Sequence, residues 1–145
     1  MDPIKYNFNE TLKLLVILAS EADKQTEAMG IGNTEEEIAI DFESHFKMNE
    51  SIFIENGFLT EAQASELSEI DQFFEKRSND QYEEFWLGIE SHPDWVTLRE
   101  MAKRCLAILD KENLNIEIET KNTVSKLTGN LVSQNIVVNL INNGT

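Results

Sequence analysis

The chain has 145 residues and a mass of 16.6 kDa, the size of one ordinary domain. Hydrophobic residues make up 41% of it and charged residues 27%, a balance that excludes an intrinsically disordered chain. Asp and Glu number 27 against 12 Lys and Arg, so the formal net charge is -15. This charge argues against direct binding to nucleic-acid phosphates or to an anionic membrane, because both depend on Lys and Arg.

The sequence predicts a single cytoplasmic domain over residues 1–145. Its one cysteine, Cys105, cannot form an internal disulfide, which fits a reducing compartment, and we expect a buried apolar thiol there. The most apolar run, residues 14–19, is far shorter than the roughly 20 residues that a membrane span requires. No signal peptide is predicted at the start of the chain.

Residues 9–29 predict one long helix that is apolar on nearly all sides. Asn7 or Asn9 can cap its beginning, and Gly30 and Gly32 follow its end. A helix of this kind is buried on most sides, so we place it at the centre of a helical bundle. The apolar positions are Leu12, Leu14, Leu15, Val16, Ile17 and Leu18.

A second helix is predicted over residues 35–48. Thr34 and Glu37 have the spacing of a capping box, which satisfies free amides in the first turn. The alternation of apolar residues over 38–42 also fits a strand, but the capping box and the length favour a helix. The face expected to be buried carries Ile38, Phe42, His45 and Phe46.

A connector over residues 51–59 is predicted to lead into a third helix, residues 61–77. Thr60 and Gln63 form a second capping box at its beginning. Its apolar stripe consists of Gln63, Leu67, Ile70 and Phe74, with Phe73 beside it.

Two more helices are predicted after the break at residues 78–80. The first, residues 81–90, is short and amphipathic. The second runs over residues 94–111, with Pro93 at its first position and His92 as a capping or turn residue. The residues expected to face the interior are Tyr82, Phe85, Trp86 and Ile89 on the first helix and Trp95, Leu98, Ala102, Cys105, Leu106 and Leu109 on the second.

The segment 113–145 is rich in asparagine and β-branched residues. It predicts two or three short strands, around 114–120 and 131–141, while residues 123–132 fit a short helix equally well. The predicted fold class is therefore mainly α, a bundle of about five helices over residues 1–112, with a small β element at the C-terminus.

Acidic residues are concentrated in the middle of the chain. Residues 34–94 hold 17 acidic and three basic residues, which accounts for nearly the whole net charge. Acidic helix surfaces often serve solubility alone. A single-sign field of this size also attracts a basic partner and rejects acidic competitors. The candidate partner-binding residues, on the polar faces of the middle helices, are Glu36, Asp41, Glu43, Asp71, Glu75, Glu83 and Glu84.

Motifs for catalysis or cofactor binding are not found in the sequence, and we expect neither a cofactor nor a metal. Glu37, Asp41 and His45 are spaced i, i+4, i+8 on one helix stripe, which is the best metal candidate. Metal sites in bundles usually draw ligands from several helices, so a surface stripe is the simpler interpretation. Trp86 and Trp95 are expected in the core, and the alternative is that one of them anchors an interface.

Small size, acidity, a helical body and the lack of a catalytic motif resemble bacterial immunity proteins, the antidotes of contact-dependent growth inhibition and other polymorphic toxin systems. The resemblance covers residues 8–112 and implies a cytoplasmic protein that covers the active site or substrate groove of one toxin. That toxin would be a basic C-terminal toxin domain, often a nuclease. The motifs that carry the resemblance are Asn56-Gly57-Phe58-Leu59-Thr60, Ile70-Asp71, Phe85-Trp86 and His92-Pro93-Asp94-Trp95-Val96-Thr97-Leu98-Arg99.

Two alternatives remain at this point. An acidic nucleic-acid mimic or adaptor that binds another basic protein would carry the same charge. An enzyme that uses carboxylates, with or without a metal, would need a deep pocket joining Glu37, Asp41 or His45 to groups from other helices.

Overall fold

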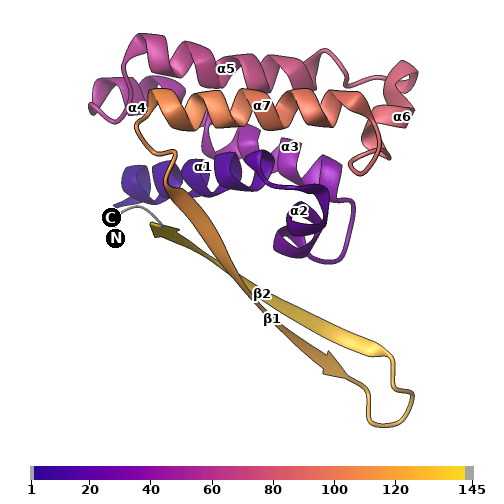
Figure 1. Cartoon of the computed structure of the whole chain (residues 1–145). Coiled ribbons are helices and arrows are strands. Elements are labelled where there is room, and N and C mark those ends of the chain that lie inside the picture. Colours follow the sequence, from indigo (N-terminus) through magenta and orange to yellow (C-terminus); the bar gives the residue numbers. More distant parts are fainter. Residues whose placement is uncertain (1, 143–145) are drawn as a thin grey trace.

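The computed structural model describes residues 2–142, which form a helical body and a long β-hairpin that projects from it (Figure 1). This arrangement confirms the predicted fold class, mainly α with a small antiparallel β element at the C-terminal end. The elements are α1 (Pro3–Ala19), α2 (Ala22–Met29), α3 (Thr34–His45), the 3-10 turn η1 (Lys47–Asn49), α4 (Glu50–Glu55), α5 (Glu61–Glu75), the 3-10 turn η2 (Asp80–Tyr82), α6 (Glu83–Trp86), α7 (Pro93–Ile108), β1 (Leu114–Val124) and β2 (Leu131–Asn142).

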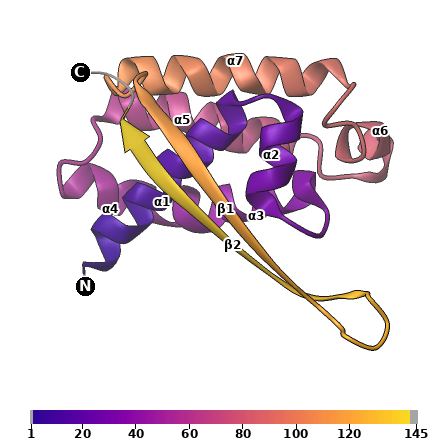
Figure 2. The ribbon, with the colours of Figure 1, turned by 60° about the horizontal axis from the view of Figure 1, so that its bottom comes forward.

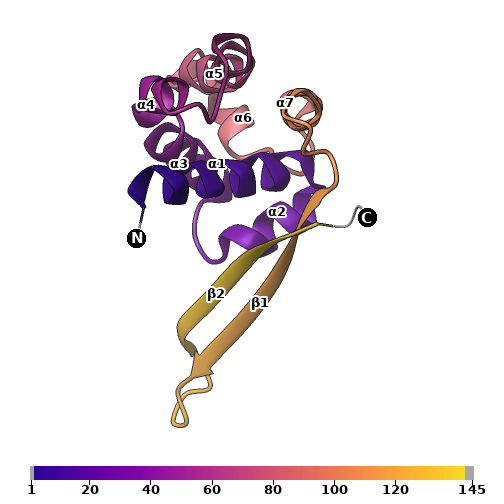
Figure 3. The same ribbon diagram turned by 90° about the vertical axis from the view of Figure 1, so that its left-hand side faces the viewer.

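Helix α1 lies at the centre, as predicted. It contacts α7 and α3 on the body side and the hairpin on the other, so it lies between these layers (Figure 3). All of its predicted apolar residues are buried, and the one charged residue among them, Lys13, pairs with Glu10 at 2.9 Å. Among the described residues, no helix combines the length and the apolarity that crossing a membrane requires.

The prediction of one continuous helix over residues 9–29 is wrong, because the chain turns sharply between α1 and α2. The helix begins earlier, where Asp2 caps the amides of Ile4 and Lys5. It ends at Ser20, which has an extended backbone. The buried Gln25 then folds back, and its Nε2 donates to the carbonyl of Leu18 at 3.0 Å. Because the Gln25 side chain takes this carbonyl, the helix ends without a Gly or Pro, and the sequence gives no sign of the break.

Two further local predictions need correction in the middle of the chain. Asn33, one residue before the predicted cap, accepts the hydrogen bond from the Glu36 amide, and Thr34 is buried in the first turn of α3. Part of the predicted connector forms the short helix α4, which buries Phe53. The second capping box is confirmed, since Thr60 and Gln63 exchange hydrogen bonds at the beginning of α5.

An aromatic cluster joins α5, α6 and α7. The predicted helix over residues 81–90 is shorter than expected, but its apolar stripe still turns inward. Phe85 stacks on Trp95 with ring centroids 4.9 Å apart and an interplanar angle of 7°. Trp95 is fully buried, and its Nε1 donates to the Phe85 carbonyl at 2.9 Å. His92 caps α7 by accepting from the Asp94 amide, as predicted.

The hairpin crosses the body diagonally and extends past it (Figure 2). Strand β1 pairs antiparallel with β2, with Leu114 opposite Asn142 and Val137 opposite Glu119. The proposal of a short helix over residues 123–132 is wrong, because this segment is the end of β1 and the turn into β2. Near that turn the side chains are exposed, Leu127 by 97%. The body holds the hairpin as far as Gln134, whose Oε1 accepts from the Ile31 amide at 3.0 Å.

Replacing Trp95 tests the aromatic cluster. Trp95→Ala removes the largest buried side chain and its hydrogen bond to the Phe85 carbonyl, which keeps the bond from the Gly88 amide. We expect the free energy of unfolding to fall by about 3–5 kcal/mol, measured by denaturant titration. Val96→Ala, at the neighbouring exposed position, is the control and should change stability by less than about 0.5 kcal/mol.

Candidate functional site: an acidic groove

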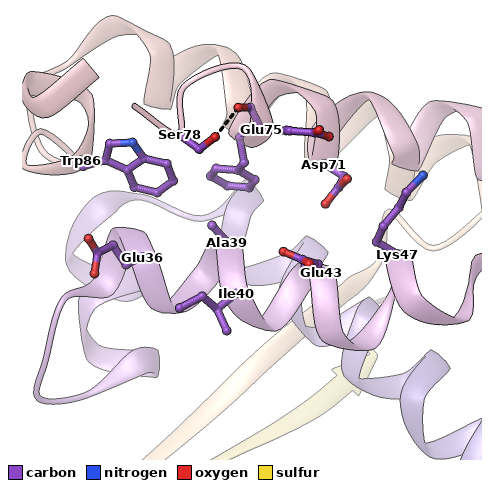
Figure 4. A pocket seen from close by; sticks show the side chains of 10 residues that line it. Glu36, Ala39, Ile40, Glu43, Lys47, Asp71, Glu75, Ser78 and Trp86 are labelled. Carbon is purple, nitrogen blue, oxygen red and sulfur yellow. Dashed lines mark hydrogen bonds between the residues drawn. The ribbon is translucent and has the colours of Figure 1, made fainter. Parts of the chain in front are cut away.

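A groove of about 530 Å³ lies between α3 and α5. Figure 4 shows side chains from both helices converging on it, with Trp86 of α6 at one end and Lys47 of η1 at the other. The lining residues are Glu36, Ala39, Ile40, Glu43, Lys47, Asp71, Phe74, Glu75, Ser78 and Trp86.

The apolar part of the groove consists of two packed aromatic rings from α5 and α6 on one side and an exposed isoleucine of α3 on the other. Phe74 and Trp86 stack with centroids 6.0 Å apart, and Trp86 Nε1 donates to the Arg77 carbonyl at 2.6 Å. Across from them Ile40 is 60% exposed. Aromatic rings held in this way offer contact area at little cost in conformational entropy, which is typical of interface anchors.

Carboxylates line the groove from both helices. Glu36 and Glu43 come from α3, and Asp71 and Glu75 come from α5; the side chains of Glu43 and Asp71 extend toward each other in Figure 4. The one cation in the lining, Lys47, forms an ion pair with a carboxylate outside it, Glu50, at 3.4 Å. The groove therefore presents an excess of negative charge over an apolar floor.

The carboxylate of Asp71 is destabilised by its position in the groove. Burial raises the pKa of its carboxyl, and the nearby Glu43 and Glu75 add to the rise, while Lys47 opposes it. A cation brought by a ligand would lower this electrostatic energy, because it replaces like-charge repulsion by attraction. The groove can therefore bind a surface or segment that combines an apolar side chain with Lys or Arg.

Four of the seven candidate partner-binding residues line this groove. Asp41 lies on another face of α3, together with Glu37 and His45, in a second groove beside β2. Glu83 and Glu84 are exposed on α6 and do not belong to the lining of the acidic groove.

The residues of the metal hypothesis share the second groove, but among the described residues no group of three or more His, Cys, Asp or Glu side chains could hold a metal ion. His45 instead places Nδ1 at 2.9 Å from Asn7 Oδ1. Cys105 is buried, as predicted.

Sequence reasoning did not find the apolar floor. Phe74 and Trp86 were expected in the core by their periodicity, and each does pack there along one side. Ile40 belongs to the alternation of apolar residues over 38–42 that also fits a strand, and no role in a binding surface follows from that pattern. An isoleucine on the polar face of an acidic amphipathic helix was the one signal available.

Comparisons with protein-family models, with curated proteins and with solved structures find no match for this chain.

Neutralising Asp71 tests the charge repulsion in the groove. Because the pKa of Asp71 is raised in the folded chain, its ionised form opposes folding above its ordinary pKa of 3.8. Asp71→Asn should therefore raise the melting temperature at neutral pH, and the gain should vanish below pH 3.8. Thermal unfolding at both pH values measures this, with Glu69→Gln on the exposed side of α5 as the control; equal gains from both variants would contradict it.

The thiol of Cys105 should be unreactive in the folded chain. Burial raises its pKa from 9.0 to about 12, with Glu66 and Glu69 adding to the effect. Since the thiolate is the reacting form, we expect modification by a disulfide reagent at mildly alkaline pH to be about a thousandfold slower than in the unfolded chain. Comparable rates with and without denaturant would contradict this result.

Proposed function

We propose that this chain is an immunity protein that binds and neutralises a basic toxin domain through the acidic groove between α3 and α5. The groove would accept a positively charged surface of the toxin, such as the substrate groove of a nuclease, and would keep substrate away from it. The resemblance in residues 8–112 suggests the class, and the groove supplies a place and a chemistry for the contact.

The observation that carries this proposal is the gathering of carboxylates around exposed apolar groups. Burial raises the pKa of the Asp71 carboxyl, and Glu43 and Glu75 add to the rise. Ile40 and Trp86 line the same groove as these three carboxylates. Charge in this arrangement speeds association and selects a basic partner, while the apolar groups supply contact area. A surface needed only for solubility would gain nothing from concentrating carboxylates at an apolar groove.

The decisive experiment mixes the purified chain with the basic toxin domain encoded beside its gene. We expect a 1:1 complex whose affinity falls with salt, and loss of toxin activity in proportion to the chain added. The double variant Glu43→Lys, Glu75→Lys should weaken binding by about a hundredfold or more, because two attractive contacts become repulsive. Calorimetry and a toxin activity assay measure the two effects.

A matched control separates the groove from the overall field. The variant Glu83→Lys, Glu84→Lys makes the same charge change on α6, away from the groove lining, and should weaken binding by less than about tenfold. Equal losses from the two variants would overturn the assignment to the groove. If the neighbouring toxin domain neither binds nor is inhibited, or if a lysate yields a housekeeping DNA-binding protein as the tight ligand, the immunity proposal fails.

A further inference from the structure

A second groove, of about 560 Å³, runs between β2 and the helical body. Four consecutive residues of the strand line it, Ile136 to Asn139. Side chains alternate between the two faces of a strand, so a groove that touches four in succession follows the strand's edge rather than one of its faces.

The backbone along this edge is unpaired. Strand β2 pairs with β1 on one side only, because the sheet has two strands. Among the described residues, no backbone hydrogen bond joins residues 136–139 to any element other than β1. In an antiparallel pair, every second residue turns its N–H and C=O away from the partner strand. Two of these four residues therefore direct their backbone groups into the groove.

The edge of β2 lacks the features that normally prevent strand pairing. Exposed edges are usually protected by charged residues, Pro or bulges. Strand β1 carries Glu117, Glu119 and Lys121, whereas the twelve residues of β2 contain neither a charged residue nor a proline. The one register shift lies at the far end of the hairpin, at Thr123 and Val124. Strand β2 is therefore the edge suited to accept another strand.

The opposite wall of this groove is apolar and acidic. Leu14 and Ile17 of α1 lie beside Ala28 and Met29 of α2. The acidic residues are Glu37 and Asp41 of α3 and Glu10 of α1. Glu10 pairs with Lys13 at 2.9 Å, but no ion pair with Lys or Arg involves Glu37 or Asp41 among the described residues.

The two unpaired carboxylates gain from a cation in the groove. Burial raises the pKa of Glu37, and Asp41 adds to the rise; burial also raises the pKa of Asp41, which His45 opposes and Glu10 reinforces. A lysine on an added strand can lay its aliphatic stem along the half-buried Met29 and extend its ammonium group to these carboxylates.

We propose that β2 accepts an extended segment of a basic partner protein as a third strand, with lysine or arginine side chains facing Glu37 and Asp41. This proposal builds on the proposed function, since it gives the partner a second contact, on the stripe of α3 adjacent to the acidic groove. The added strand would take the hydrogen bonds left open along residues 136–139.

The experiment uses the full chain and a short peptide in which lysine and threonine alternate, followed by amide hydrogen exchange in NMR spectra. Two of the four amides at 136–139, in alternation, should exchange rapidly in the free chain and become protected when the peptide binds. A peptide with glutamate in place of lysine should not bind. The double variant Glu37→Gln, Asp41→Asn should fold normally, because it removes two charges that burial opposes in the native chain. It should bind the lysine peptide about fivefold more weakly.

Several outcomes would overturn the proposal: protection elsewhere, equal binding of the two peptides, or unchanged affinity of the double variant. Protection of the same amides that rises with the concentration of the chain alone would assign the edge to a second copy and would equally overturn it. The variant Glu43→Lys, Glu75→Lys separates this inference from the proposed function. If that variant loses toxin binding while the lysine peptide fails to protect β2 in the native chain, the groove proposal stands and the strand proposal falls.

Discussion

Burial of the C-terminal half of α1 is the constraint on which the rest of the structure depends. Its apolar segment, residues 12–18, requires cover from several directions, and α3, α7 and the base of the hairpin supply it. Each of these covering elements packs apolar side chains against α1. The carboxylates of the middle of the chain are thereby left on the outer faces, where water solvates them.

Helix α3 carries acidic residues on two different surfaces of the molecule. Glu36, Ile40 and Glu43 follow one stripe of the helix and face α5. Glu37 and Asp41 follow the adjacent stripe and face α1 and β2. Both stripes are acidic and both border exposed or half-buried apolar groups, so a single helix of twelve residues contributes to two grooves that suit basic ligands. Burial and a neighbouring carboxylate both raise the pKa values of Asp71, Glu37 and Asp41, so each of these groups gains from a nearby cation.

Local signals in the sequence predicted most elements. They failed where a side chain from the next helix ends α1 and where two neighbouring residues are equally suited to cap α3. The capping box at Thr60 and the proline at position 93 act on the first turn of the helix that follows, so the sequence alone predicted where α5 and α7 begin. The turn after α1 depends on the hydrogen bond from Gln25 to the Leu18 carbonyl. The cap of α3 is Asn33, and Thr34, one residue later, is an equally good capping residue in the sequence. The candidate contact residues were chosen by charge, and charge alone does not say which helix faces will lie next to each other.

The sequence by itself determined the acidic character, the mainly helical body with its apolar central helix, and the β-rich end, because composition and periodicity are properties of the chain. Only the tertiary structure decided that Glu36 and Glu43 lie opposite Asp71 and Glu75, that Asp41 belongs elsewhere, and that the edge of β2 stays open beside α3. The physical reason is that grooves form between elements far apart in sequence, and their pairing follows from how the layers pack around α1.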